Sequence, residues 1–212
     1  ALTRWAGELG ADFAMVVTPN YYKPAMKPEI LRAHYHEVAD KSTIPIVLYN
    51  VPIFTMLNMS ADLVTELASH PNIVGIKDSS GDMLQLQEIC RRTRENFPVL
   101  TGSGSLLLAS LAAGAGGAIL AVANVAYDLC VDIVDAFDRG DWNRARKLQY
   151  RLTPINQAVT VEFGIAGLKA LLDKLDFYGG PPRSPLQRAT PEIQRKILGI
   201  YQEAHKEETG RS

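Results

Sequence analysis

The chain has 212 residues, and its 22 basic and 23 acidic side chains give a formal net charge of −1. This balance disfavours nucleic-acid binding, because a protein that replaces counterions on phosphates needs a basic surface. Although 47% of the residues are hydrophobic, no apolar run reaches the roughly 18 to 20 residues of a membrane-spanning helix. The two cysteines, Cys90 and Cys130, lack any partner motif. We therefore expect a soluble intracellular globular protein without a disulfide framework or zinc site.

Five continuously apolar runs have the length of β-strands. They cover residues 12–18, 44–51, 73–77, 97–101 and 118–125. Because apolar and polar residues do not alternate in them, they indicate strands buried on both faces, as in parallel sheets covered by helices. Successive strand ends lie roughly 20 to 35 residues apart, which is the size of one βα unit. The sequence thus predicts an α/β protein with a parallel sheet.

Helical patterns follow these strands and continue after the last one. Pro28 suits the first turn of a helix, Ser60 is a good N-cap, and Thr190-Pro191-Glu192 combines a cap, a first-turn proline and an acid. The predicted helices cover residues 28–40, 61–70, 83–96, 106–115, 141–158, 164–175 and 190–205. The breaker cluster at 178–182 predicts a loop, and the polar tail after Lys206 is expected to fray. We therefore predict five βα units over residues 1–152 and a helical extension over 153–212.

Lys77 is the candidate catalytic residue with the clearest position, because it ends an otherwise apolar strand. Chemistry in parallel α/β folds is found at the carboxyl ends of strands, and a buried cation without a partner is costly. One interpretation is a Schiff-base lysine, since an apolar surrounding favours the neutral amine that attacks carbonyl carbons. The alternative is that Lys77 pairs with Asp78 or reaches solvent.

Tyr49 ends the preceding strand at an equivalent depth, so its phenol is either a proton-transfer group or a packed aromatic ring. The segment Gly102-Ser103-Gly104 precedes a helix and could bind an anion, but it lacks a complete nucleotide-binding pattern. The four histidines show no spacing typical of metal ligands, and no nucleophile-elbow motif is present.

Two motifs, Tyr49-Asn50-Val51-Pro52 and Gly75-Ile76-Lys77-Asp78-Ser79, resemble those of class I pyruvate-dependent aldolases of the dihydrodipicolinate synthase and N-acetylneuraminate lyase superfamily. Tyr49 and Lys77 are 28 positions apart, as in that superfamily. The resemblance extends over almost the whole chain through residues 17–22, 100–103, 121–125 and 163–169. Within the superfamily, the chain is most similar to mitochondrial 4-hydroxy-2-oxoglutarate aldolases, on its Thr-Pro-x-Tyr-Tyr segment, its Lys-Asp-Ser segment and residues 178–186.

This resemblance implies a (β/α)8 barrel with additional C-terminal helices, assembled as a homotetramer of two tight dimers. It implies cleavage of 4-hydroxy-2-oxoglutarate to pyruvate and glyoxylate in the mitochondrion, without a metal or an organic cofactor. Lys77 would form the imine with the 2-oxo carbon, Tyr49 would move the proton of the 4-hydroxyl, and Tyr21 would extend the relay across the dimer interface. Ser79 would hydrogen-bond the substrate. The pocket would be lined by Gly102, Ser103 and Ile119.

Two departures from the family pattern keep other interpretations open. Phe54 stands where bacterial dihydrodipicolinate synthases carry an arginine for a substrate carboxylate, and a phenyl ring cannot make that charge-assisted bond. The early Gly-Ser/Thr-x-Gly-Glu loop of the family is not found, so the chain is expected to hold only strands 4–8 of the barrel, an incomplete barrel. The alternatives are therefore a dihydrodipicolinate-synthase-like enzyme, a sugar-acid pyruvate aldolase, or a truncated, inactive chain that associates with full-length subunits.

Overall fold

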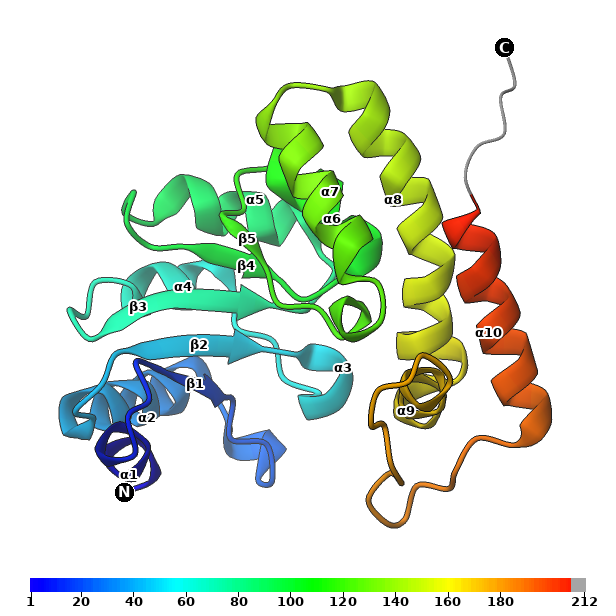
Figure 1. Cartoon of the computed structure of the whole chain (residues 1–212). Helices are drawn as coiled ribbons and strands as arrows, with labels where there is room; N and C mark the ends of the chain where they lie inside the picture. Colours follow the sequence, from blue (N-terminus) through cyan, green and yellow to red (C-terminus); the bar gives the residue numbers. More distant parts are fainter. Residues whose placement is uncertain (207–212) are drawn as a thin grey trace. The chain divides into compact units, whose positions relative to one another are not determined.

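The computed structural model of the chain describes residues 1–206 (Figure 1). The predicted fraying of the tail concerns residues outside that range. The strands are β1 (Ala14–Val17), β2 (Ile46–Asn50), β3 (Ile73–Asp78), β4 (Val99–Thr101) and β5 (Gly117–Ala118). The helices are α1 (Leu2–Glu8), α2 (Pro28–Lys41), α3 (Pro52–Thr55), α4 (Ala61–Leu67), α5 (Met83–Arg92), α6 (Leu107–Ala112), α7 (Tyr127–Asp138), α8 (Trp142–Gln157), α9 (Gly164–Lys174) and α10 (Pro191–His205).

The strands form one parallel sheet in the order β1-β2-β3-β4-β5. This confirms the α/β class and the parallel sheet predicted from the apolar runs. Parallel neighbours place all carboxyl ends at one edge, so residues that end adjacent strands meet there. Along that edge β2 and β3 pair Tyr49 with Lys77 and Asn50 with Asp78.

The fifth strand is much shorter than the sequence predicts. Of the expected strand 118–125, only Ala118 lies in β5, and Val122–Asn124 form a 3-10 turn. The Asn124 side chain donates a hydrogen bond to the Ala121 carbonyl at 2.9 Å, and Val122 is fully buried. Both features stabilise a turn within an apolar segment, and periodicity alone does not distinguish a buried strand from a buried turn.

Contacts divide the described chain into two compact units. The first comprises residues 1–103 and 109–119, and the second comprises residues 104–108 and the described residues from 120 onward. In the first unit, α2, α4 and α5 pack on one face of the sheet, as Figure 1 shows. Tyr35 of α2, Leu67 of α4 and Ile89 of α5 are fully buried in that core.

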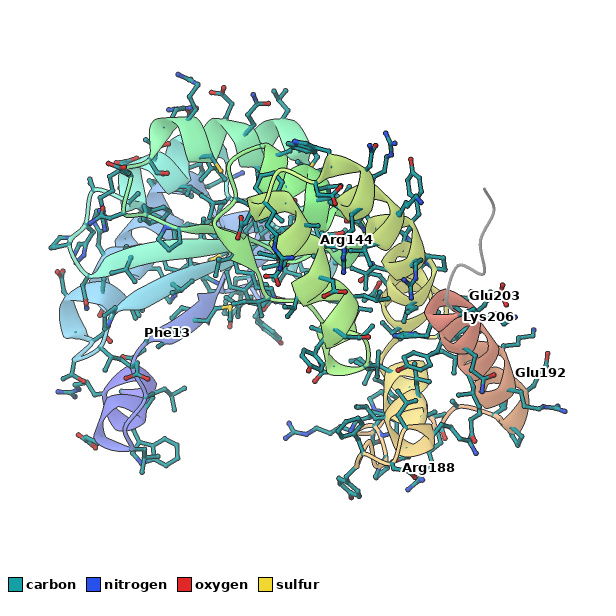
Figure 2. The ribbon with its side chains drawn as sticks, turned by 45° about the horizontal axis from the view of Figure 1, so that its top comes forward. Phe13, Arg144, Arg188, Glu192, Glu203 and Lys206 are labelled. Atoms are coloured by element: carbon teal, nitrogen blue, oxygen red, sulfur yellow. The ribbon has the colours of Figure 1, made fainter. Side chains whose placement is uncertain are left out.

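The opposite face of the first unit's sheet is exposed at β1, although Val47 of β2 on the same face is buried. Met15 and Val17 of β1 point away from the core side and are exposed, whereas Ala14 and Val16 pack against the core. Phe13, which precedes β1, is exposed as well (Figure 2). Because side chains alternate along a strand, the exposed face is the one that carries Tyr49 and Lys77.

The second unit is helical. Helix α8 packs against α7 and α10, and α9 packs against α10. Asp141 caps α8 by accepting a hydrogen bond from the Arg144 amide at 3.0 Å, and Thr190 caps α10 in the same way through the Ile193 amide at 3.3 Å. The division of the chain at residue 152 into a barrel part and an extension stays a prediction.

Candidate active site

Lys77 and Tyr49 lie side by side at the carboxyl ends of β3 and β2. Their Cα atoms are partners in the sheet, and the Lys77 Nζ lies 4.3 Å from the centre of the Tyr49 ring. Both side chains are half-buried, so a small molecule above the sheet edge can reach the amine. The two residues that the sequence singles out for proton transfer and imine formation are therefore neighbours in space.

Asp78 does not neutralise Lys77. Among the described residues no ion pair joins them, and the Asp78 carboxylate accepts hydrogen bonds from Asn50 Nδ2 at 2.7 Å and Ser80 Oγ at 2.6 Å. Consecutive residues of a strand point to opposite faces, which places the Asp78 side chain on the core side. The structure therefore does not support the interpretation in which Lys77 is the counter-ion of Asp78.

Gly102 brings the end of β4 close to the lysine. Its amide donates to the Asp78 carbonyl at 2.8 Å, and a Cβ atom at position 102 would lie 3.2 Å from Lys77 Cε and would overlap Ser79 Oγ. Only glycine allows this approach. Ser79 and Gly102, both predicted to bind substrate, therefore lie beside Lys77.

The remaining predicted residues are placed less closely. The Ser103 amide donates to Thr101 Oγ1 at 3.3 Å, and the Ile119 amide donates to the Thr101 carbonyl at 3.0 Å, so both follow strand ends on the same sheet edge. Tyr21 is 87% exposed and packs edge-on against Tyr22, with ring centres 5.0 Å apart. No contact between Tyr21 and Tyr49 is present in residues 1–206.

Asn50 is a site residue that sequence reasoning missed. Its side chain is fully buried and joins three segments, because it contacts Asp78, accepts from the Met59 amide at 3.0 Å and donates to Asn58 Oδ1 at 2.8 Å. The sequence does contain a feature that could have indicated this role. A polar residue directly follows each candidate catalytic residue, Asn50 after Tyr49 and Asp78 after Lys77.

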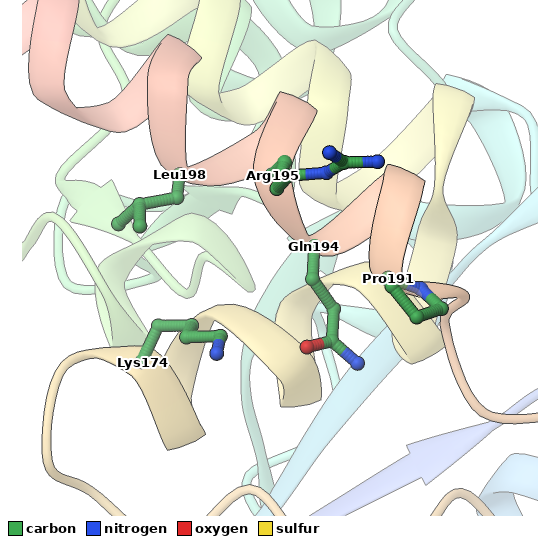
Figure 3. A pocket seen from close by; sticks show the side chains of 5 residues that line it. All are labelled: Lys174, Pro191, Gln194, Arg195 and Leu198. Atoms are coloured by element: carbon green, nitrogen blue, oxygen red, sulfur yellow. The ribbon is translucent and has the colours of Figure 1, made fainter.

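The rest of the described chain offers no competing centre of comparable chemistry. In residues 1–206 there is no group of three or more His, Cys, Asp or Glu side chains that could hold a metal ion. The same part of the chain contains no helix long and apolar enough to cross a membrane. A surface pocket in the second unit, shown in Figure 3, is lined by Lys174 of α9 and by residues of α10. It holds neither a nucleophile with a base nor a buried titratable pair.

The fold and site define a parallel α/β protein that presents a lysine and a tyrosine together at the carboxyl edge of its sheet. Comparison with known proteins makes this specific. The model of the dihydrodipicolinate synthetase family matches residues 1–204, and the chain belongs to this family. Membership confirms the superfamily indicated by the two motifs, and it places the chain among enzymes of lyase type.

Curated relatives are named 4-hydroxy-tetrahydrodipicolinate synthase. The protein of Thermodesulfovibrio yellowstonii is 38% identical over 96% of this chain and 69% of its own length. That of Methanoculleus marisnigri is 42% identical over 93% of this chain and 68% of its own length. Among solved structures, a dihydrodipicolinate synthase from Bacillus anthracis superposes with a TM-score of 0.90 at 31% identity, over 95% of this chain and 68% of that one. The Aquifex aeolicus enzyme gives a TM-score of 0.88 at 35% identity, over 95% of this chain and 69% of that one.

These relatives overturn the activity expected from the closest resemblance. The prediction of a 4-hydroxy-2-oxoglutarate aldolase is wrong, because relatives at 37–42% identity carry the synthase name. The motifs around Tyr49 and Lys77 indicate the superfamily, and they do not determine the second substrate. Phe54, whose side chain is 73% exposed on α3, does not by itself exclude the synthase type. The mitochondrial location gains no support from these relatives.

Proposed function

We propose that this chain carries the imine-forming site of an enzyme of the 4-hydroxy-tetrahydrodipicolinate synthase type, with pyruvate as the substrate bound to Lys77. The observation that carries the proposal is the registered pair of Tyr49 and Lys77, with the amine 4.3 Å from the ring centre. Family membership and the relatives' names support the same reaction class.

The chemistry follows from an amine beside a phenol. Lys77 Nζ adds to the 2-oxo carbon of pyruvate, and loss of water leaves a protonated imine that acts as an electron sink. Removal of a proton from C3 gives an enamine, whose carbon attacks the aldehyde carbon of the second substrate. The aldehyde oxygen takes up a proton, and water then releases the product and restores the amine. Tyr49 is the group placed to deliver and accept these protons.

The neighbours of this pair have supporting roles in the proposal. Ser79 hydrogen-bonds the bound 2-oxo acid, and Gly102, Ser103 and Ile119 border it at the sheet edge. Tyr21 continues the proton relay across a dimer interface within a homotetramer. The exposure of its ring is what supports that role, because a side chain that serves a neighbouring subunit must reach out of its own.

The sheet supports a larger architecture than the described residues contain. We propose that β1 to β5 correspond to strands 4–8 of an eight-stranded (β/α) barrel. The chain spans 67–70% of the length of its relatives, and the sheet face that carries Met15, Val17 and Lys77 is exposed at β1. An apolar sheet face and two unpaired parallel edges need cover. Addition of the segment of the Thermodesulfovibrio yellowstonii enzyme that precedes the matched part should raise the melting temperature of the chain, and no effect would contradict this architecture.

A sugar-acid pyruvate aldolase is the second candidate. A dipicolinate skeleton carries two carboxylates, so the aldehyde substrate of a synthase brings a second carboxylate that needs a donor. Helix α3, directly after the site, exposes Ile53 and Phe54 and offers no cation. This observation favours an aldehyde whose carbon chain near α3 is uncharged.

Reductive trapping tests the proposed imine. The protein is incubated with pyruvate and sodium borohydride, digested, and its peptides are mapped by mass spectrometry. We expect the reduced pyruvyl group on the peptide with Lys77, and its loss in Lys77→Ala. An intact fold without an adduct, or an adduct that persists in Lys77→Ala, would overturn the proposal. Turnover with carboxylated and with uncharged aldehydes then distinguishes the two candidates.

A further inference from the structure

A buried polar pair lies directly beneath the candidate catalytic pair. Asn50 and Asp78 are sheet partners one residue beyond Tyr49 and Lys77, so their side chains point to the opposite face, toward the core. Asn50 is 0% and Asp78 2% exposed. Burial of an amide against a carboxylate is costly unless hydrogen bonds replace water, so the pair calls for a physical reason.

The hydrogen bonds of this pair are nearly complete. Asn50 Nδ2 donates to Asp78 Oδ1 at 2.7 Å and to Asn58 Oδ1 at 2.8 Å, while Asn50 Oδ1 accepts from the Met59 amide at 3.0 Å. Ser80 Oγ occupies the other carboxylate oxygen at 2.6 Å. Among the described residues no cation pairs with Asp78. Neutral donors therefore hold the Asp78 carboxylate. Its hydrogen bond with Asn50 joins β3 to β2 and so fixes the position of Asn50 relative to Asp78.

The register of β2 on β3 gives this constraint a purpose. Ile46 pairs with Ile73, but Val47 pairs with Gly75, so the ladder shifts by one residue between them. If the register of Ile46 continued, Tyr49 would face Ile76, and Asn50 would face Lys77. The shift is what aligns Tyr49 with Lys77. Within β2 and β3, polar side chains that can distinguish one register from the next occur only at Tyr49, Asn50, Lys77 and Asp78.

We propose that Asn50 and Asp78 are positioning residues that hold β2 and β3 in the shifted register and so keep Tyr49 beside Lys77. A slipped register that continued the pairing of Ile46 with Ile73 would place Asn50 opposite Lys77 and Asp78 opposite Val51, and the hydrogen bond between Asn50 and Asp78 would be lost. The penalty for that loss makes the productive register the unique one, which is the best-attested use of buried polar pairs. The pair acts through Tyr49 and Lys77 and does not touch the substrate. This inference rests on the proposed imine chemistry of Lys77.

Two variants separate positioning from simple stabilisation. Asn50→Leu/Asp78→Leu replaces the polar pair by side chains of nearly the same volume. We therefore expect the chain to stay folded, while the hydrogen bond that distinguishes the shifted register is lost. Asn50→Asp/Asp78→Asn exchanges the amide and the carboxylate and retains a hydrogen bond between them. Asn143→Asp is the matched control, because Asn143 is exposed on α8, away from the catalytic pair, and its Oδ1 accepts a hydrogen bond from Arg146 at 3.0 Å that a carboxylate can also accept.

Two readouts follow each variant. The first is the rate of pyruvate trapping on Lys77, for which we expect a loss of at least about tenfold in the leucine variant, since a displacement of about 1 Å costs on the order of 100-fold. The exchanged variant and Asn143→Asp should stay within about threefold of the parent chain. The second is oxidative crosslinking of a Leu48→Cys/Ile76→Cys pair, which are sheet partners in the shifted register. We expect crosslinking to fall in the leucine variant alone.

The outcomes are distinguishable from those of the proposed function. If the parent chain is not trapped on Lys77, the imine chemistry fails, and crosslinking alone decides the positioning role. If the parent is trapped and the folded leucine variant retains both trapping and crosslinking, the positioning role is overturned. A leucine variant that does not fold leaves the exchanged variant as the test: loss of trapping and crosslinking there, in a folded chain, would equally overturn the proposal.

Discussion

Replacement of Gly102 by alanine tests the packing around Lys77. The new methyl group would overlap Ser79 Oγ, lie 2.8 Å from Ser79 Cβ and lie 3.2 Å from Lys77 Cε. Ordinary contacts between carbon atoms are about 3.5 to 4.0 Å, so Ser79 must retreat by about 1 Å and Lys77 by a few tenths. Such overpacking costs about 1–3 kcal/mol of stability. Ser79, the proposed hydrogen-bond donor to the substrate, is then misplaced by about 1 Å, and a misplacement of that size lowers the rate of trapping by on the order of 100-fold.

The assay measures the rate at which pyruvate and borohydride label Lys77, together with thermal unfolding. Gly199→Ala is the matched control, because the same methyl group is added in α10 where no atom lies within 4 Å of it. We expect that control to keep the parent rate and to gain up to about 1 kcal/mol, as glycine-to-alanine changes in helices do. A folded Gly102→Ala chain that is trapped at the parent rate would refute the close approach of β4 to the amine.

Three further outcomes are expected. Phe54→Arg should raise turnover of carboxylated aldehydes relative to uncharged ones by about tenfold, since a guanidinium binds carboxylate bidentately. Unchanged selectivity would show that α3 does not contact the aldehyde substrate. Thr18→Val should raise the free energy of unfolding in urea by about 1 kcal/mol, because the buried Thr18 hydroxyl has no hydrogen-bond partner among residues 1–206; a lower free energy of unfolding would show that the hydroxyl is hydrogen-bonded. Burial, aided by the Asp128 charge, raises the pKa of Cys130 to about 11, so at pH 8 the thiolate fraction is low and alkylation of the folded chain should be slower than in urea; equal rates would contradict the burial.

The strands show which parts of the fold a single sequence can predict. The runs that became β2 and β3 are rich in β-branched residues and end in polar residues, so their type, direction and burial could be inferred. The segment after Ala118 is equally apolar, but its alanines and Asn124 suit a turn, and its hydrophobicity carries no information on that choice. The shift of register between Ile46 and Val47 also leaves no sequence signal, because it depends on pairing between strands.

The site residues also differ in how far the sequence can predict them. Lys77 and Tyr49 stood out as a long cation and a phenol at the ends of apolar strands, but their position left other interpretations open, and it was the resemblance of the two motifs that favoured catalytic roles. Asn50 could not be assigned a role from the sequence, since its contacts with Met59 and Asp78 exist only once the sheet has formed. The substrate was inferred wrongly because the two motifs indicate the superfamily and carry no information on the second substrate, and Phe54 alone was too little evidence.

The most direct test of the central claim is exchange of the methyl protons of pyruvate in D2O, followed by proton nuclear magnetic resonance without any aldehyde present. An imine on Lys77 converts reversibly to an enamine, so the account predicts that the chain accelerates loss of the methyl signal and that Lys77→Ala does not. Exchange at the uncatalysed rate with a folded chain, or equal acceleration by Lys77→Ala, would contradict the account.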